Sequence, residues 1–241
     1  MIETIKTLFW VSRPISWINT AYPFAIAYWL SSGDAGITLW IGTLFFLIPY
    51  NLLMYGINDV FDYESDLRNP RKGGIEGALL DPKWHRLTIW AAIISSFPFV
   101  LHLYVYGNLS SNIWTTLILF TVVAYSAKGL RFKEKPILDS ITSASHFVGP
   151  MLIGASLAGA NLLEPKLLFI ALAFTLWGMA SHAFGAVQDV KADREGGISS
   201  IATVIGARAT VWFAFLAYAA AGILVLFTGM PAALSAIAAV P

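Results

Sequence analysis

The sequence has no cysteine and little charge, and both shortages narrow the classes of protein that it can encode. Without cysteine the chain forms no disulfide and offers no thiolate to a haem or a zinc ion. Asp, Glu, Lys and Arg make up only 12% of the 241 residues, and the net charge of +1 indicates no particular partner. Hydrophobic residues make up 57% and the mean hydropathy is +0.69, which is typical of an integral membrane protein.

Long apolar stretches recur along the chain, each near the roughly 20 residues that an α-helix needs to cross a bilayer. We expect spans at residues 14–32, 37–57, 87–106, 112–127, 137–159, 166–186 and 208–228. The last residues open an eighth apolar segment that is too short to cross. The sequence therefore predicts an all-α, polytopic transmembrane helical bundle of about seven to eight spans, with residues 1–241 as a single transmembrane domain.

Positive charge lies almost entirely on one side of this predicted bundle. On the other side, the connectors 31–36, 106–112, 160–166 and 228–231 contain only Lys166 out of the 15 Lys and Arg residues. The remaining 14 basic residues precede the first span, lie in the opposite set of connectors or, in the case of Arg208, begin the last span. Because Lys and Arg are enriched in cytoplasmic loops, we expect the basic side to be cytoplasmic.

Acidic residues form two motifs on the same side. The first acidic motif follows the second apolar stretch and consists of Asn58, Asp59, Asp62 and Asp66. If that helix continues, its aspartates lie at i, i+3 and i+7, within about 60° of arc on one helical face. The second acidic motif, Asp189 and Asp193, has i, i+4 spacing at the end of the sixth apolar stretch. No charge is needed in the middle of the membrane, which argues against a proton relay.

Carboxylates packed this closely repel one another unless a cation neutralises them. Mg²⁺ uses one or two protein carboxylates, keeps several waters and completes its octahedron with phosphate oxygens of a substrate. Two acidic helix ends that face each other would hold a diphosphate through bridging Mg²⁺, while nearby basic side chains bind its remaining oxygens. The predicted catalytic metal ligands are Asp59, Asp62, Asp66, Asp189 and Asp193, and the predicted diphosphate contacts are Arg71, Lys128 and Arg131. The alternative is that these aspartates are ordinary solvated residues at helix ends. That alternative would explain a single aspartate well, but it explains two spaced clusters on the same side poorly.

The two motifs resemble the signatures of the UbiA superfamily of intramembrane prenyltransferases. The first acidic motif matches the family pattern Asn-Asp-x-x-Asp-x-x-x-Asp, and the second matches Asp-x-x-x-Asp. The connector 125–139 is similar to the family's Tyr-Ser…Leu-Arg-x-Lys…Pro-x-x-Asp segment, and residues 13–19 resemble its usual opening. The resemblance extends from residue 13 to about residue 210.

This resemblance implies a ring of transmembrane helices around a central, lipid-open cavity that the two acidic loops cap. It also implies Mg²⁺-dependent transfer of an allylic prenyl group from a prenyl diphosphate to a hydrophobic acceptor, with Asn58 and Tyr125 as further substrate-binding residues. Full-length members have more helices, so the resemblance implies that this chain lacks the last one or two. The expected partners are the diphosphate, a lipid-soluble acceptor and membrane lipids, with no nucleic acid.

The segment after Asp66 narrows the expected substrates. Many relatives that prenylate aromatic rings continue toward an Arg-Thr…Arg-Pro pattern, whereas residues 69–77 read Asn-Pro-Arg-Lys-Gly-Gly-Ile-Glu-Gly. That form resembles the branch of the family that elongates carotenoids by adding a C5 unit from dimethylallyl diphosphate to the ends of lycopene. The resemblance therefore implies dimethylallyl diphosphate and lycopene as the substrate pair.

The sequence does not exclude other functions. A transporter or cation channel would use the aspartates as ligands, although it would call for broken helices and ionisable residues near the midplane. A non-catalytic membrane subunit could retain the fold, but a scaffold has no use for carboxylates that repel one another. Within the family, an aromatic quinone precursor or a tetrapyrrole could be the acceptor.

Overall fold

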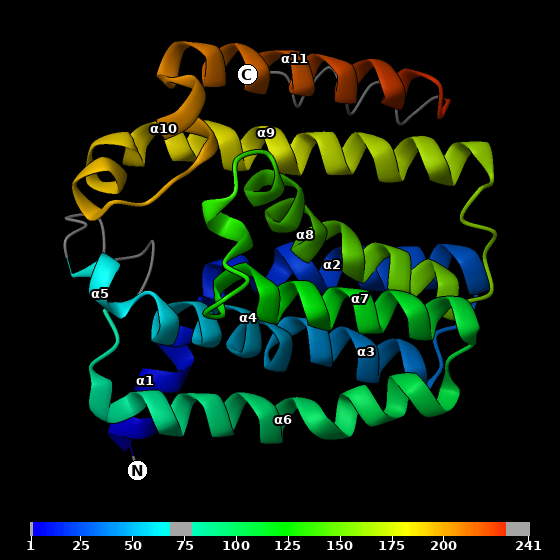
Figure 1. Ribbon diagram of the computed structural model, residues 1–241. Helices are drawn as coiled ribbons and strands as arrows, with labels where there is room; N and C mark the ends of the chain where they lie inside the picture. The colour runs from blue at the N-terminus through cyan, green and yellow to red at the C-terminus, as the bar shows by residue number, and fades with distance from the viewer. Residues whose placement is uncertain (1, 68–78, 230–241) are drawn as a thin grey trace. The chain divides into compact units, whose positions relative to one another are not determined.

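The computed structural model describes residues 2–67 and 79–229, and all regular secondary structure in these ranges is helical, as predicted (Figure 1). The chain divides into two compact units. Unit 1 holds residues 1–131 and 149–160, and unit 2 holds residues 132–148 and 161–241. Helix α8 (Leu138–Leu157) contributes its first half to unit 2 and its second half to unit 1.

Unit 1 is built mainly from helices that pack along one another. Before α8 its elements are α1 (Ile2–Val11), η1 (Pro14–Ser16), α2 (Trp17–Ser32), α3 (Ile37–Leu47), α4 (Pro49–Phe61), α5 (Tyr63–Asp66), η2 (Pro82–Trp84), α6 (His85–Tyr106) and α7 (Leu109–Ser126). Helix α2 packs on α3, α1 packs on α4, and both α6 and α7 contact α4. Helix α4 is therefore central to the unit that carries the first acidic motif.

The second predicted span consists of two helices that meet at a break. Helix α3 ends at Leu47 and α4 begins at Pro49, because proline has no N–H group to continue the helical hydrogen-bond ladder. Next to the break, the carbonyl oxygen of Phe46 accepts hydrogen bonds from Thr20 Oγ1 at 2.6 Å and Asn51 Nδ2 at 2.8 Å. Since Thr20 and Asn51 are fully buried, these bonds pair polar groups inside an apolar region and join both α2 and α4 to the end of α3.

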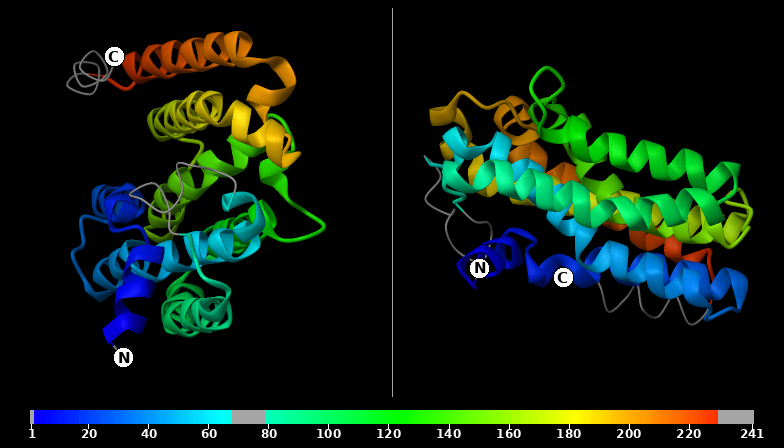
Figure 2. Two further views of the ribbon diagram at one scale, coloured as in Figure 1. Left: turned by 90° about the vertical axis from the view of Figure 1, so that its left-hand side faces the viewer. Right: turned by 90° about the horizontal axis from the view of Figure 1, so that it is seen from below.

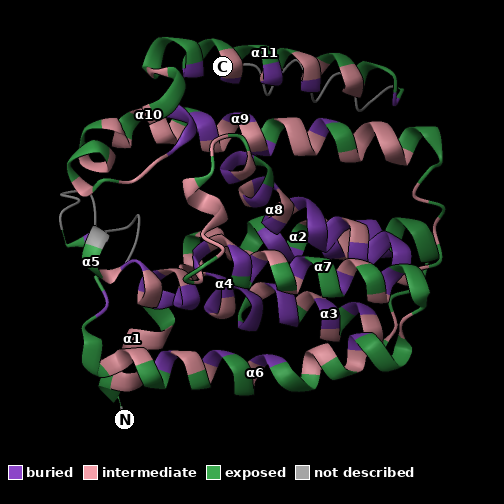
Figure 3. Ribbon diagram, in the orientation of Figure 1, coloured by how far each residue is buried: buried purple, intermediate pink, exposed green. Residues whose placement is uncertain are grey.

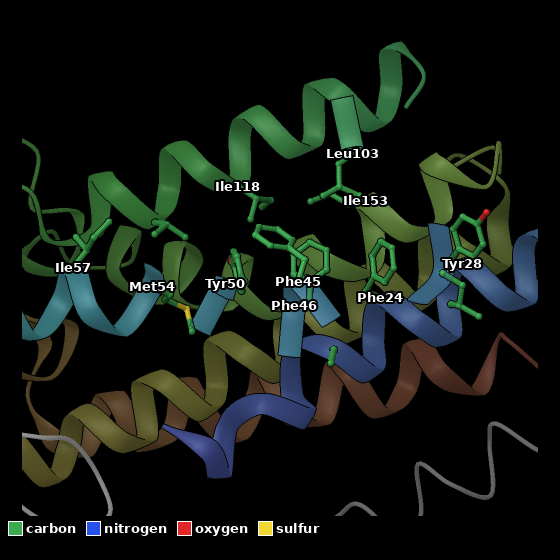
Figure 4. Packing of buried hydrophobic residues seen from close by; sticks show 13 residues of the cluster. Phe24, Tyr28, Phe45, Phe46, Tyr50, Met54, Ile57, Leu103, Ile118 and Ile153 are labelled. Carbon is green, nitrogen blue, oxygen red and sulfur yellow. The ribbon is translucent and has the colours of Figure 1, made fainter. Parts of the chain in front are cut away.

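The core of unit 1 contains a row of aromatic rings from α2, α3 and α4 (Figure 4). Four of them are almost completely buried, at 1% exposure or less: Phe24, Phe45, Phe46 and Tyr50. The ring centroids of Phe45 and Phe46 are 4.8 Å apart, and those of Phe24 and Phe46 are 5.0 Å apart. Because rings in edge-to-face or tilted arrangements attract through their quadrupoles, each pair contributes roughly 0.5–1.5 kcal/mol beyond simple burial.

Helix α8 comes very close to α2 at Gly154. A Cβ atom at this position would lie 2.5 Å from the backbone carbonyl oxygen of Phe24, closer than Cβ atoms approach such atoms in real proteins. Small residues commonly let helix backbones approach in membrane proteins. The lack of a side chain at residue 154 therefore permits the packing of α8 on α2.

Unit 2 contains η3 (Phe132–Glu134), the first half of α8, α9 (Pro165–Gly196), α10 (Ile201–Ile205) and α11 (Ala207–Leu226). Helices α9 and α11 pack against each other and are neighbours in Figure 2. Small buried side chains line their contact, namely Ala180, Ala214 and Ala217. A hydrogen bond of 2.8 Å between Ser181 Oγ and Tyr218 Oη adds a polar link. This close packing holds α9, the helix that carries the second acidic motif.

Five helical segments within the described residues are long and apolar enough to cross a membrane: Ile37–Phe61, Pro82–Tyr106, Leu109–Ser126, Pro165–Gly196 and Ala207–Leu226. The two other predicted spans are also helices, α2 with 16 residues and α8 with 20. Large apolar side chains remain exposed along α6 and α11, where Figure 3 shows much green. A surface of this kind suits contact with lipid.

Several predicted boundaries differ from the observed helix ends; the second span, for example, continues beyond residue 57 to Phe61. The first transmembrane helix begins at Trp17, because Pro14–Ser16 form a 3-10 turn before it. The fourth begins at Leu109, since Asn108 and Ser111 form a capping box there. The sixth does not stop at residue 186 but continues to Gly196, so the second acidic motif is fully helical.

Candidate functional site

The first acidic motif lies where α4 ends and α5 begins. Helix α4 stops at Phe61, and Asp62 is its C-cap with φ −101° and ψ 0°. The helical ladder nevertheless crosses this point: Asp62 N–H donates to the Asn58 carbonyl at 2.9 Å, and Asp66 N–H donates to the Asp62 carbonyl at 2.8 Å. The expected single helix is therefore bent at Asp62, while the helical spacing of the aspartates is kept.

All three aspartates of this motif are buried. Asp59 is 1% exposed, Asp62 is 4% exposed and Asp66 is 8% exposed. A buried carboxylate loses its hydration, so it is stable only where cations or hydrogen-bond donors compensate. The arrangement thus concentrates negative charge at a place that calls for positive partners.

Arg13 supplies one of these partners. Its Nη2 atom donates to Asp59 Oδ1 at 2.7 Å, and its guanidinium lies over the ring of Tyr55, 4.1 Å from the centroid. The Arg13 side chain is 15% exposed and that of Asp59 is 0% exposed, so water screens this ion pair little. The left-handed backbone of Arg13, with φ 49°, is uncommon for residues other than glycine. The prediction of site residues missed Arg13, although it lies in the family-like opening 13–19.

The connector after α7 reaches the same motif within unit 1. Arg131 Nη2 lies 3.9 Å from Asp62 Oδ1, and Ser126 Oγ donates to Asn58 Oδ1 at 3.0 Å. The structure therefore brings together the predicted basic residue Arg131 and the first acidic motif, which are far apart in the sequence. Ser126 was not predicted, and its place beside Tyr125 in the family-like connector is the signal that points to it.

The other predicted substrate contacts are less enclosed. Tyr125 is half-buried in the last turn of α7, and Lys128 is exposed in the turn that follows. Arg71 lies outside the described residues, as does the whole segment 69–77.

The second acidic motif lies on the last turns of α9. With 32 residues and a rise of 1.5 Å per residue, this helix is about 48 Å long, whereas the hydrocarbon core of a bilayer is about 30 Å thick. The helix is therefore long enough to carry Asp189 and Asp193 beyond the apolar layer. Both aspartates are partly buried and lie four residues apart on one helix, as the sequence pattern indicates.

A tight turn after α9 holds Asp193. The helix ends at Gly196, and its C-cap Gly197 has a φ of 67°, in the left-handed region that favours glycine. Ile198 N–H donates to the Asp193 carbonyl at 2.8 Å, and Ser200 Oγ donates to Asp193 Oδ2 at 2.9 Å. Lys133 is also near enough for its positive charge to act on this carboxylate, a neighbour that the sequence did not single out.

The chemistry of these donors fits magnesium better than zinc. Among the residues that the structure describes, no three His, Asp or Glu side chains gather closely enough to enclose a metal ion by themselves. A closed zinc site needs about four protein ligands, whereas Mg²⁺ needs one or two carboxylates and takes its other oxygens from water and phosphate. Buried aspartates with neighbouring basic residues therefore suit Mg²⁺ that binds together with a diphosphate.

Comparison with known sequences identifies a family and specific relatives. The sequence profile of the UbiA prenyltransferase family matches residues 20–241. The C(50) beta-cyclic carotenoids biosynthesis protein LbtBC of Dietzia sp. (strain CQ4) is 55% identical over 238 residues, which cover 98% of this chain and 55% of that protein. The lycopene elongase/hydratase of Corynebacterium glutamicum (strain ATCC 13032) is 53% identical over 233 residues, 96% of this chain and 80% of that protein. The chain thus spans about half the length of the first relative.

Solved structures share the fold. A UbiA homolog from Archaeoglobus fulgidus bound to DMAPP and Mg²⁺ has a TM-score of 0.75 and 18% identity, with 96% of this chain and 82% of that chain covered. The apo structure of a UbiA homolog from Aeropyrum pernix K1 has a TM-score of 0.67 and 19% identity, with 93% and 84% covered. At these identities the likeness concerns the fold, and it confirms the predicted UbiA-like architecture.

Proposed function

Because the chain belongs to the UbiA prenyltransferase family, we propose that it is an integral membrane enzyme that transfers an allylic prenyl group from a prenyl diphosphate to a hydrophobic acceptor, with Mg²⁺ as cofactor. The observation that carries this proposal is the presence of both acidic motifs in a chain that the family profile matches from residue 20 to residue 241. The aspartates of the first motif are buried, and a scaffold subunit would have no use for buried carboxylates that repel one another.

The two acidic motifs are assigned to the metal and the diphosphate. The proposed metal ligands are Asp59, Asp62, Asp66, Asp189 and Asp193. Bound Mg²⁺ would neutralise the diphosphate oxygens and so make the diphosphate a better leaving group. Arg131, 3.9 Å from Asp62, adds positive charge beside the first acidic motif. The further proposed diphosphate contacts are Asn58, Arg71, Tyr125 and Lys128.

The reaction requires that water stays away from the reacting carbon. When the allylic C–O bond breaks, the diphosphate leaves with the electron pair and the allyl group carries positive charge. A double bond of the acceptor then forms the new C–C bond, and the resulting cation loses a proton or adds water. Aromatic and apolar side chains suit these steps, because they exclude water and aromatic faces attract positive charge. The chain supplies many such faces, with 16 Phe, 9 Trp and 9 Tyr.

The proposed substrate pair is dimethylallyl diphosphate and lycopene. A relative named lycopene elongase/hydratase is 53% identical to the chain, and the A. fulgidus homolog of similar fold was bound to DMAPP. A long hydrocarbon has no polar head group, so its binding needs an apolar surface rather than a charged side chain. Apart from their first residues, the seven apolar stretches contain no Lys or Arg, which agrees with this requirement.

The charge distribution supports one orientation in the membrane. We propose that both acidic motifs lie on the cytoplasmic side, because nearly all Lys and Arg residues lie on the same side as these motifs. The family match supports residues 1–241 as one transmembrane prenyltransferase domain.

The test uses purified protein in lipid nanodiscs with Mg²⁺, dimethylallyl diphosphate and one acceptor at a time. Lycopene should give products that are one and two C5 units heavier by mass spectrometry, with or without added water. Asp189→Ala should remove these products. Asp81→Asn is the matched control, because Asp81 is an exposed residue that caps a 3-10 turn, and this variant should stay active.

The outcomes separate the parts of the proposal. If lycopene stays unchanged while a hydroxybenzoate, a naphthoate or a chlorophyllide is prenylated, the acceptor is wrong and the transfer mechanism stands. If the wild-type protein prenylates none of these acceptors, or keeps its activity in excess chelator, the Mg²⁺-dependent mechanism is wrong.

A further inference from the structure

A buried carboxylate outside the two acidic motifs, Asp139, links three segments of unit 2. It lies in the first turn of α8 and is 0% exposed. Its Oδ1 atom accepts hydrogen bonds from the N–H and the hydroxyl of Ser140 at 2.6 and 3.1 Å. Its Oδ2 atom accepts a hydrogen bond from Ile201 N–H at 2.8 Å and lies 3.8 Å from His182 Nε2 of α9. One carboxylate thus joins the start of α8, the start of α10 and the middle of α9.

The bond to Ile201 continues to the second acidic motif. Ser200 precedes Ile201 and is the N-cap of α10, where it forms a capping box with Thr203. The hydroxyl of Ser200 donates to Asp193 Oδ2 at 2.9 Å. Asp139 therefore holds the backbone at Ile201, and the side chain of the adjacent Ser200 orients the Asp193 carboxylate.

Helical geometry shows where these contacts lie on α9. His182 precedes Asp189 by seven residues and Asp193 by eleven, which are about two and three full turns. At 100° per residue the three side chains fall within about 40° of arc, so they share one face of α9. Asp139 approaches His182 on this face and reaches Asp193 through Ser200. Its contacts with Ile201 and His182 thus connect the segment after α9 to that face.

We propose that Asp139 is a positioning residue for the second acidic motif, which holds Ser200 where its hydroxyl keeps the Asp193 carboxylate in the orientation that binds metal. The inference rests on the proposed function, since it takes Asp193 as a Mg²⁺ ligand. A metal-ligating carboxylate is commonly oriented by an outer hydrogen bond, and loss of such a bond lowers metal affinity by about 10–100-fold. Asp139 acts less directly than such a bond, through the backbone at Ile201 and then the hydroxyl of Ser200.

A purely structural role makes a different prediction. If Asp139 only stabilised unit 2, its variants would yield less folded protein, but the molecules that fold would bind metal as the wild type does. A positioning role instead lowers the metal affinity of the folded protein. It raises the Mg²⁺ concentration needed for half-maximal activity and changes kcat at saturating Mg²⁺ much less.

The experiment compares Asp139→Asn, Ser200→Ala and the double variant with the wild type in nanodiscs. Mn²⁺ serves as the probe, and its binding in the presence of inorganic diphosphate is followed by electron paramagnetic resonance. Ser200→Thr retains the hydroxyl and should bind Mn²⁺ as the wild type does. Ser181→Ala is the matched control, because its hydroxyl also forms a side-chain hydrogen bond in unit 2, but to Tyr218 of α11.

Asp139→Asn and Ser200→Ala should each lower Mn²⁺ affinity by about tenfold. The double variant should lose no more Mn²⁺ affinity than the single variant with the larger loss, because both substitutions interrupt the same chain of contacts.

Wild-type Mn²⁺ affinity in folded Ser200→Ala would overturn the inference even if Asp139→Asn did not fold. Additive losses would overturn the link through Ser200. If the wild type itself bound no Mn²⁺ with diphosphate, the proposed function would fail together with the inference, whereas equal binding by wild type and variants would reject the inference alone.

Discussion

Replacement of Arg13 by glutamine tests how the buried charge of Asp59 is balanced in the metal-free protein. The two side chains are 15% and 0% exposed and are joined at 2.7 Å. Removal of one partner from a buried ion pair costs about 3–5 kcal/mol. Since Asp59 also has interactions other than the one with Arg13, we take the lower value of about 3 kcal/mol. For a chain of this size each kcal/mol lowers Tm by about 2–4 °C, so Arg13→Gln should unfold about 6–12 °C below the wild type.

Mg²⁺ should reduce the difference in unfolding temperature between Arg13→Gln and the wild type. A ligand that binds only the folded protein stabilises it by about 2.7 kcal/mol at a hundredfold excess over its Kd. In the wild type the metal would compete with Arg13 for Asp59, whereas in Arg13→Gln it would meet a carboxylate that has lost this cation. The variant should therefore gain more stability than the wild type from Mg²⁺ with inorganic diphosphate.

The assay is thermal unfolding of detergent-solubilised protein, followed by tryptophan fluorescence in chelator and in Mg²⁺ with diphosphate. Arg13→Lys should lose part of the stability, because lysine keeps the charge but not the planar group over Tyr55. Arg208→Gln, which removes an exposed charge at the start of α11, should unfold close to the wild type. The reasoning is refuted if metal-free Arg13→Gln unfolds at the wild-type temperature, or if Mg²⁺ stabilises both proteins equally.

Three more experiments test the metal site, the packing and the topology. Asp62→Ala should abolish product formation while the protein elutes as a folded species on size exclusion, and full activity would remove Asp62 from the site. Gly154→Ala should lower the free energy of unfolding by about 1–3 kcal/mol, because its methyl group would meet the backbone of α2 at 2.5 Å, whereas Gly222→Ala has open space around it and should not destabilise. Equal thermal stability of the two alanine variants would contradict the packing argument. Single cysteines at Ser32 and Ser199, in a chain without cysteine of its own, should react with an impermeant maleimide from opposite faces of sealed vesicles, and labelling from one face would contradict the proposed topology.

The membrane class, the helical segments and the two acidic motifs could be predicted from the sequence because each depends on neighbouring residues alone. A run of apolar residues has the length and hydropathy of a span whatever it packs against. The i, i+3, i+7 spacing of Asp59, Asp62 and Asp66 survives in the structure even though the helix bends at Asp62. Arg131 was predicted from its place in the connector, and the structure puts it beside Asp62.

The partners of the buried charges were decided only by the tertiary structure. Arg13 and Asp59 are 46 residues apart, and Asp139 and Ile201 are 62 residues apart, so no local pattern connects them. Which groups meet depends on which helices pack together, and that depends on shapes spread along the chain, such as the missing side chain at Gly154. A carboxylate can be recognised in a sequence by its type and spacing. Its compensation by a cation or an N–H donor is a property of the packed helices, because burial and neighbours exist only once the chain has folded.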